Sequence, residues 1–400
     1  MIPRHVPALA LGTLALGVAE FSMMSILLPV ADDLGVTVPE AGHFISAYAA
    51  GVCAGVLIMA AAPLKTLLLI IVGIITLGNT LTVFVGSYHL MLLSRFIAGL
   101  PHGAYFGAAG VLCTQLAEPG KASRDMCLMV AGMTIANLAG VPLASFLAWA
   151  VSWRAAFAIA AAAALITFSA IRITVPKVPA LPDSGFAAQF RFLRSLEPWL
   201  VLGAIGLGNG GFFAYYSYVN PVMEHVAAVP ASMMSVVITL AGAGMVLGNL
   251  FCAKISSSFS DESLAAAGQG VLLLSLASVF FLAHWSPAAI ALTTLAAGCV
   301  FFISGPEQVL MIRNAKEGQL LAASLAQVSF NAGNAVGAWL GGLPIDAGKA
   351  ANWAAMPGFF LALAGFGLLF VNWLIHRVRE EERTAGRIAA LQDQIQSKMP

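Results

Sequence analysis

The chain has 400 residues, of which 60% are hydrophobic and 9% are charged, and its formal net charge is +1. This composition excludes a soluble domain, because too little polar surface is available to meet water. It indicates an all-α membrane protein with many spans and, without a basic patch, gives no support for nucleic-acid binding.

Twelve segments have the length and composition of membrane-spanning helices. Crossing about 30 Å of hydrocarbon takes roughly 20 apolar residues in a helix. Breaks rich in charge, Pro, Gly, Asn or Asp divide the chain accordingly, and no segment alternates as the strands of a membrane barrel do. The predicted spans are 7–30, 41–62, 66–86, 90–116, 126–148, 154–174, 197–220, 231–253, 265–284, 286–310, 319–341 and 353–376.

The basic residues predict the orientation of these spans. Sixteen of the nineteen Lys and Arg residues fall in the tails and in the loops on the side of the N-terminus. Arg154 and Lys349 fall on the other side, and Arg95 lies within a span. The positive-inside rule therefore places both termini in the cytoplasm.

Cysteine spacing indicates neither a disulfide framework nor a metal site. The five cysteines lie in apolar spans at unrelated spacings, which favours packing roles. No cofactor is expected. The five cysteines are Cys53, Cys113, Cys127, Cys252 and Cys299.

A polar stretch with three prolines lies midway along the chain, where a linker between two halves is expected. Pro29-Val30 is repeated as Pro221-Val222, and the Asn137–Gly140 segment resembles Asn334–Gly337, at offsets of 192 and 197 residues. Such offsets are typical of parallel repeats, whose substrates bind between the halves near the bilayer midplane. The predicted organisation is a six-helix bundle over 1–174, a cytoplasmic linker over 175–196, a second six-helix bundle over 197–376 and a cytoplasmic tail over 377–400.

Three segments carry a resemblance to a known family. They are Gly17-Val18-Ala19-Glu20-Phe21, the run from Arg95 to Gly103 (RFIAGLPHG), and Asn137 with Gly140-Val141-Pro142. Together with a 6+6 pattern, they resemble the drug:proton antiporter branch of the major facilitator superfamily, and within it the arabinose-efflux-permease-like bacterial exporters. The resemblance covers the chain to about residue 376. It implies a pseudo-symmetric 6+6 fold, a multi-pass protein of the bacterial inner membrane, and antiport.

The loop between the second and third spans departs from this family. Members carry a Gly/Asp/Arg-rich signature there, with several basic residues. Here the loop is Ala60-Ala61-Ala62-Pro63-Leu64-Lys65, with a single Lys. This leaves open whether the cytoplasmic latch implied by the signature, and normal gating, are retained.

Glu20, Arg95 and His102 are the candidate proton-coupling residues. A charge in hydrocarbon costs at least about 2.5 kcal/mol, so an acid there is a functional candidate. Burial favours the neutral carboxyl, which suits Glu20 to bind and release a proton; a permanently paired structural acid is the alternative. The resemblance implies that Arg95 controls this protonation, whereas a structural Arg would extend its side chain outward to the interface. His102 either titrates or binds substrate, or is a packed neutral imidazole.

Small residues predict close helix contacts in two spans. Gly99 and Gly103 allow a neighbouring helix to approach the fourth span. Asn137, Gly140 and Pro142 resemble the antiporter signature of the fifth span. They predict a kinked helix that packs tightly against a helix of the other half.

Polar faces on two spans predict the walls of a substrate cavity. Ser324, Gln327, Asn331 and Asn334 follow at helical spacing on the eleventh span. Amides facing lipid would lack partners, so this face lines a cavity or binds another helix. The seventh span has a similar face with amides and aromatic rings. That face consists of Asn209, Phe213, Tyr216 and Asn220.

Three further features have simpler interpretations. Tyr48 and His43 are candidate cavity residues in the second span. Glu307 is expected to pair with Arg313, six residues later. Apolar residues at helical spacing after Arg377 predict a cytoplasmic surface helix or a partly disordered end.

The sequence thus predicts a monomeric, proton-coupled exporter of sugars, nucleosides or drug-like molecules, with small-molecule substrate, protons and lipid as partners. An alternative is a facilitator or importer of a small polar solute without proton coupling. A remote alternative is a polytopic membrane enzyme or sensor. The scattered histidines and the lack of a nucleophile–base pair or a metal spacing argue against catalysis.

Overall fold

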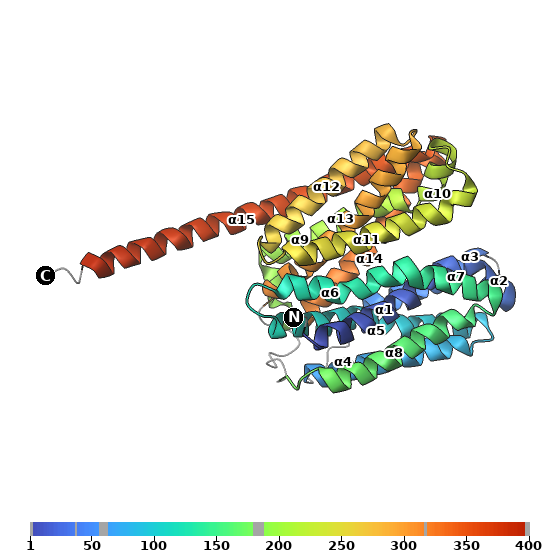
Figure 1. Cartoon of the computed structure of the whole chain (residues 1–400), viewed down its shortest axis with the longest axis horizontal. Coiled ribbons are helices and arrows are strands. Elements are labelled where there is room, and N and C mark those ends of the chain that lie inside the picture. Colours follow the sequence, from blue (N-terminus) through green and yellow to red (C-terminus); the bar gives the residue numbers. More distant parts are fainter. Residues whose placement is uncertain (1–2, 37, 56–62, 179–187, 316–317, 397–400) are drawn as a thin grey trace.

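The computed structural model describes residues 3–36, 38–55, 63–178, 188–315 and 318–396. Its secondary structure in these ranges is helical throughout. Figure 1 shows the helices running roughly parallel to one long direction. We use "terminal face" for the end of the bundle where α1 begins and from which α15 leaves, and "opposite face" for the other end.

The N-terminal group comprises α1 to α8. Its helices are α1 (His5–Ser25), α2 (Leu27–Leu34), α3 (Val38–Gly55), α4 (Leu64–Val83), α5 (Tyr88–Leu116), α6 (Ala122–Ile135), the π-helical turn η1 (Ala136–Gly140), α7 (Val141–Ala150) and α8 (Arg154–Thr174).

The C-terminal group comprises α9 to α15. Its elements are η2 (Ala188–Arg194), α9 (Leu196–Tyr216), α10 (Val219–Pro221), η3 (Val222–Val226), η4 (Ala231–Met233), α11 (Met234–Ile255), α12 (Asp261–Leu282), α13 (Ser286–Arg313), α14 (Gln319–Asp346), η5 (Ala351–Ala354) and α15 (Ala355–Gln396).

Helices occupy the positions of the twelve predicted spans. In the described part, nine are long and apolar enough to cross a membrane. The helices that fall outside this set at predicted spans are α3, α9 and α14. The last two carry the polar faces noted above, which lower their hydropathy.

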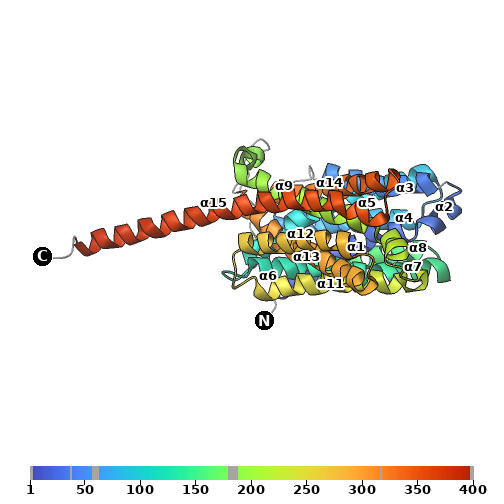
Figure 2. The ribbon, with the colours of Figure 1, turned by 90° about the horizontal axis from the view of Figure 1, so that it is seen from above.

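Two boundaries differ from the predicted ones. The first span breaks at Ile26, where α1 ends and the short α2 begins. The last helix does not stop near residue 376 but continues to Gln396, well beyond the rest of the bundle (Figures 1 and 2). The predicted tail is therefore helical in its described residues.

The same helix pairings occur in both groups. In the first, α1 packs on α6 and α8, α3 on α5, and α4 on α5 and α8. In the second, α9 packs on α14 and α15, α11 on α13, and α12 on α13 and α15. This correspondence is the 6+6 pseudo-symmetric architecture that the sequence predicted.

Glycines bring several of these helix pairs into backbone contact. A Cβ built on Gly337 would lie 2.0 Å from the Gly210 carbonyl oxygen, and one built on Gly341 would lie 2.0 Å from that of Ala214. Gly333 and Gly206 meet in the same way one turn earlier. The α9–α14 pair is therefore a small-residue interface of the GxxxG type.

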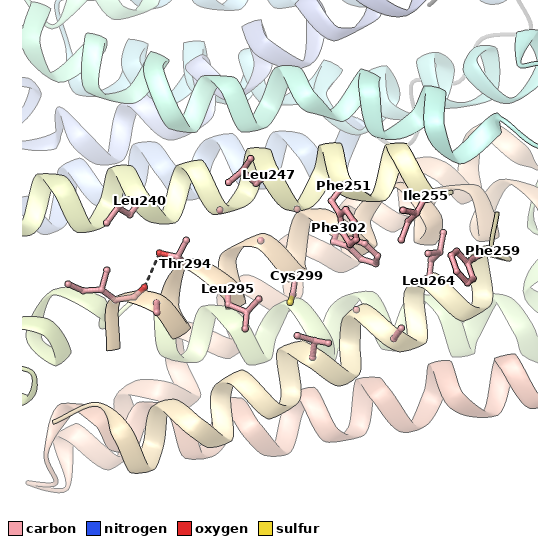
Figure 3. A pocket seen from close by; sticks show the side chains of 18 of the residues that line it. Leu240, Leu247, Phe251, Ile255, Phe259, Leu264, Thr294, Leu295, Cys299 and Phe302 are labelled. Atoms are coloured by element: carbon pink, nitrogen blue, oxygen red, sulfur yellow. Dashed lines mark hydrogen bonds between the residues drawn. The ribbon is translucent and has the colours of Figure 1, made fainter. Parts of the chain in front are cut away.

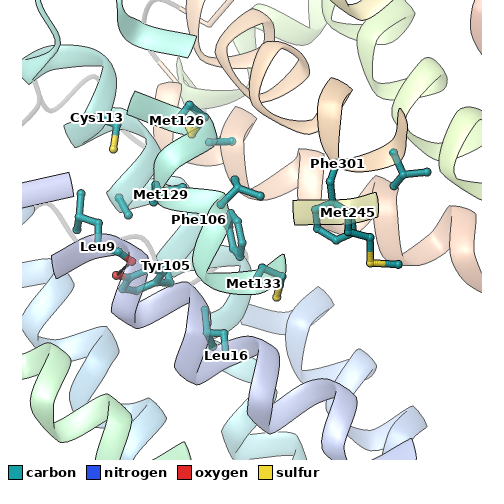
Figure 4. Close-up of a cluster of buried hydrophobic side chains, with 14 of the residues drawn as sticks. Leu9, Leu16, Tyr105, Phe106, Cys113, Met126, Met129, Met133, Met245 and Phe301 are labelled. Atoms are coloured by element: carbon teal, nitrogen blue, oxygen red, sulfur yellow. Dashed lines mark hydrogen bonds between the residues drawn. The ribbon is translucent and has the colours of Figure 1, made fainter. Parts of the chain in front are cut away.

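A large apolar core joins the two groups (Figure 4). Tyr105 and Phe106 of α5 and Met129 and Met133 of α6 lie in it on one side, and Phe301 of α13 lies in it on the other. Tyr105 donates its hydroxyl to the Leu9 carbonyl oxygen at 2.8 Å, which satisfies its buried polar atom.

Candidate functional site

Arg95 is fully buried in the N-terminal group. Its Nη2 donates to the Ala19 carbonyl oxygen at 2.8 Å, and its guanidinium lies 4.6 Å from the Tyr48 ring centroid and 5.1 Å from that of Phe157. Nε and Nη1 have no hydrogen-bond partner in the described part of the chain. Arg95 is thus held between two aromatic faces, and the alternative of an anchor extending toward the interface is wrong.

Glu20 lies beside His102 rather than in an ion pair with Arg95. Its Oε2 is 3.8 Å from His102 Nδ1, and the two side chains are 11% and 1% exposed. His102 Nδ1 also lies 2.9 Å from the Tyr48 hydroxyl, and its ring stacks on Phe106. Among the described residues, no Lys or Arg lies within 4.0 Å of this carboxyl in an ion pair. We refer to Glu20, Tyr48, Arg95 and His102 as the Glu20 cluster.

The Glu20 cluster depends on a close contact between α3 and α5. A Cβ on Gly99 would lie 2.1 Å from the Tyr48 carbonyl oxygen, and one on Gly51 would lie 2.2 Å from that of Phe96. This approach brings the Tyr48 side chain over Arg95 and against His102. Tyr48, expected in a cavity wall, is buried here, while His43 is exposed and bonds the Tyr88 hydroxyl at 2.7 Å.

Phe106 and Phe157 are cluster neighbours that the sequence analysis missed. Phe106 follows His102 by four residues, so their shared helical face was available as a signal. Phe157 comes from α8, and no sequence spacing relates it to α5.

The fifth span is irregular where the Asn137 motif predicted a kink. The π-helical turn η1 covers Asn137 and Gly140, and Pro142 lies in the first turn of α7. Asn137 donates to the Met133 carbonyl oxygen of its own helix at 3.2 Å. Missing hydrogen bonds at Pro and π turns account for the irregularity.

The fifth span packs on α11 of the other group, as the motif predicted, but Gly140 does not make this contact. A Cβ on Gly140 would meet Val18 of α1 at 2.7 Å, so Gly140 packs within its own group. Contact with the other group comes instead from Leu138, which lies against Gly242 of α11. The π turn rotates neighbouring residues onto different faces, which regular helical spacing does not anticipate.

The polar faces of α9 and α14 are only partly exposed. Asn209 and Asn331 donate to carbonyl oxygens one turn earlier in their own helices, Ile205 and Gln327. The Oδ1 atoms of Asn209 and Asn334 are buried without a partner among the described residues. Phe213 packs edge-on against Tyr216 and Phe330. That these residues together line one substrate cavity remains a prediction.

Two smaller expectations were wrong. Arg313 does not pair with Glu307 but with Glu262, and it also lies 3.8 Å from Asp261. These acids begin α12, so the pair forms between helices rather than along α13. Cys53 is exposed, whereas the other four cysteines are buried, so the packing role expected for it was wrong.

Comparisons with known proteins agree with this architecture. The model of the Major Facilitator Superfamily matches residues 9–320. The chain belongs to this superfamily. The chain is 36% identical to the putative transporter AraJ of Escherichia coli (strain K12), over 91% of this chain and 93% of AraJ.

Two further comparisons agree with this membership. The purine ribonucleoside efflux pump NepI of Escherichia coli is 26% identical over 82% of this chain and 84% of NepI. The crystal structure of FucP, a major facilitator transporter in the outward conformation, matches with a TM-score of 0.73 at 16% identity, over 92% of this chain and 98% of FucP. The protein is thus a multi-pass membrane transporter and not an enzyme.

In this major facilitator fold, hydrogen bonds join the two groups toward the terminal face. Asn249 of α11 donates to the Cys127 carbonyl oxygen at 2.7 Å, and Ser324 of α14 donates to that of Gly103 at 2.9 Å. Ser123, at the start of α6, donates to Asp261. The described conformation is therefore closed on this side.

A cross-link between Cys127 and Cys252 tests this closure. These thiols, from α6 and α11, are buried in one apolar cluster. A membrane-permeant oxidation catalyst is expected to join them, so that the two groups stay linked on a denaturing gel after cleavage within the linker. Transport should stop and return on reduction. Cys252→Ser is the control, and efficient transport by the cross-linked protein would contradict the arrangement.

Lys65 has a role within the N-terminal group. Its Nζ donates to the Arg172 and Val175 carbonyl oxygens at 2.8 and 2.7 Å, at the end of α8. A cation there satisfies terminal carbonyls and complements the helix dipole. The preceding residues of this loop, 60–62, lie outside the described ranges.

An apolar groove of about 1170 Å³ lies between α11, α12 and α13 (Figure 3). Leu247, Phe251, Leu295 and Phe302 are among its lining residues. None of the predicted cavity or proton-coupling residues lines it. Several of its side chains are exposed, as suits a surface that faces lipid.

Proposed function

We propose that the protein is a proton-coupled exporter of small organic molecules that works by alternating access. The observation that carries the proposal is the Glu20 cluster. The Glu20 side chain is 11% exposed, and its Oε2 lies 3.8 Å from His102 Nδ1. It has no Lys or Arg ion-pair partner among the described residues. Burial favours the neutral form of such a carboxyl, and its protonation breaks no salt bridge.

The surroundings of Glu20 connect its charge to helix position. Arg95 binds the carbonyl of Ala19, the residue before Glu20, and the aromatic faces of α3 and α8 hold the guanidinium. A charged Glu20 attracts this cation, whereas a neutral Glu20 does not. We infer that proton binding loosens α1 from α5 and favours the other orientation of the two groups.

A relative's name supports the proposed direction and substrate class. NepI is an efflux pump for purine ribonucleosides by its name. We propose sugars, nucleosides or drug-like molecules as substrates, with protons moving in the opposite direction. We propose that the terminal face lies in the cytoplasm at a bacterial inner membrane, because the basic residues gather on that side. We propose a monomer with its substrate cavity between α9 and α14 of one group and the facing helices of the other.

Reconstituted protein provides the test. A thermal-shift screen of sugars, nucleosides and cationic drugs at two pH values first identifies a ligand, since specific binding stabilises the folded state. In liposomes, that ligand is then expected to accumulate against its gradient when a pH gradient is imposed, and an ionophore that collapses the gradient should stop accumulation. Equilibration without accumulation would instead indicate a facilitator.

A further inference from the structure

Glu307 is a second carboxyl buried in the membrane-spanning bundle. It lies in α13, six residues before the end of that helix at Arg313, which is about 9 Å at 1.5 Å per residue. Glu307 is only 3% exposed, and its Oε1 has no hydrogen-bond partner among the described residues.

Charged groups on the helices packed against α13 have other partners. Glu262 pairs with Arg313 and His376, Asp261 accepts from Ser123, and Arg124 pairs with Asp125. At this level α13 packs on α5, α6, α9, α11, α12 and α14. The remaining titratable groups near the terminal face on these helices are Glu197, which pairs with Arg379, the exposed Lys254, and the thiols Cys113, Cys127 and Cys252.

An isolated carboxylate is very costly in this environment. A buried ion without a partner neutralises instead of staying charged. Glu307 therefore holds a proton in the described conformation, in which the terminal face is closed.

The position of Glu307 links its proton to the seam between the groups. A Cβ on Gly305 would lie 2.4 Å from Cys127 of α6, and Ile312 lies against Gly110 of α5. Pro306 precedes Glu307 and has no amide hydrogen to bond the preceding turn, so α13 is weakened at this point. Separation of α6 from α13 on the terminal side opens this region to water.

We propose that Glu307 is a second proton-binding site, which keeps its proton while the terminal face is closed and releases it when that face opens. This inference rests on the proposed proton coupling. Glu20 lies in the N-terminal group and Glu307 in the C-terminal group. Glu307 then takes up its proton from the opposite face and releases it at the terminal face, so that each transport cycle moves two protons, one through each carboxyl.

The number of protons per cycle tests the proposal. In liposomes with the membrane potential clamped at zero, an uncharged substrate stops net movement when its gradient balances the pH gradient. For a difference of one pH unit, two protons balance about a 100-fold substrate gradient and one proton about a 10-fold gradient. We expect about 100-fold for the wild type and about 10-fold for Glu307→Gln.

Glu197→Gln is the matched control, because Glu197 lies in the same group but pairs with Arg379. In this variant, net substrate movement should stop at the same substrate gradient as in the wild type. The same balance point in Glu307→Gln and wild type would overturn the second site while leaving the proposed function intact. Wild-type protein that shows no dependence on the pH gradient would instead overturn the proposed function.

Infrared spectroscopy gives a readout that does not need transport. The carbonyl band of a protonated carboxyl should be present at neutral pH in wild-type protein and weaker in Glu307→Gln. An unchanged band overturns the proposal. Glu307→Asp keeps a carboxyl and is expected to restore the wild-type balance point that Glu307→Gln loses.

Discussion

Liposomes containing Glu20→Gln are expected to hold a substrate gradient of only about 10-fold per pH unit, against about 100-fold for the wild type, because only Glu307 then carries a proton, while exchange of labelled for unlabelled substrate continues. Gln has the size of a protonated Glu but cannot bind or release a proton. The contact with His102 at 3.8 Å is retained as a neutral one. The variant therefore still alternates between orientations but moves one proton per cycle fewer than the wild type.

Glu118→Gln is the control for loss of a carboxyl. Glu118 lies between α5 and α6, outside the membrane-spanning helices, and Lys121 hydrogen-bonds it and holds the pKa of that carboxyl below its usual range. Gradient-driven uptake in this variant should equal that of the wild type. Full gradient-driven accumulation by Glu20→Gln would remove Glu20 from the coupling mechanism.

Gly337→Ala is expected to destabilise the folded protein strongly. The added Cβ would lie 2.0 Å from the Gly210 carbonyl oxygen and 2.7 Å from its carbonyl carbon. These are backbone atoms, so α9 and α14 must move apart along their glycine interface. Overpacking of this kind costs about 1–3 kcal/mol, and more where the backbone cannot move.

Gly367→Ala provides the matched comparison. A Cβ there meets nothing within 4 Å. Replacing a helical Gly by Ala also stabilises by about 0.5–1 kcal/mol. Thermal unfolding in detergent, with and without ligand, should show a lower melting temperature for Gly337→Ala and an unchanged or higher one for Gly367→Ala. Equal melting temperatures would mean that the α9–α14 contact does not determine stability.

The spans were predictable because hydrocarbon thickness sets a length that apolar segments must reach. The sixth span, for example, was predicted as 154–174 and is α8, Arg154–Thr174. The end of the last span was not predictable, because a helix does not stop where its hydropathy falls. Residues after Arg377 continue the same helix with charged side chains.

Partner choice within the bundle was much less predictable. The resemblance implied that Arg95 acts on Glu20, but a sequence leaves rotation about the helix axis undetermined, and Arg95 bonds the backbone of α1 instead. Arg313 was assigned to Glu307 because the two are near in sequence. The acids that begin α12 lie nearer in space.

Composition and periodicity alone therefore determined a twelve-helix membrane protein with an acid, an arginine and a histidine inside its first half. These properties follow from the free energy of moving each residue type from water into lipid, which depends on the residue itself. Tertiary structure alone decided that Tyr48 and Phe157 enclose Arg95, that His102 meets Glu20, and that Glu307 has no ion-pair partner among the described residues. Such contacts depend on how helices rotate and approach one another, and side chains far apart in the sequence set those angles together.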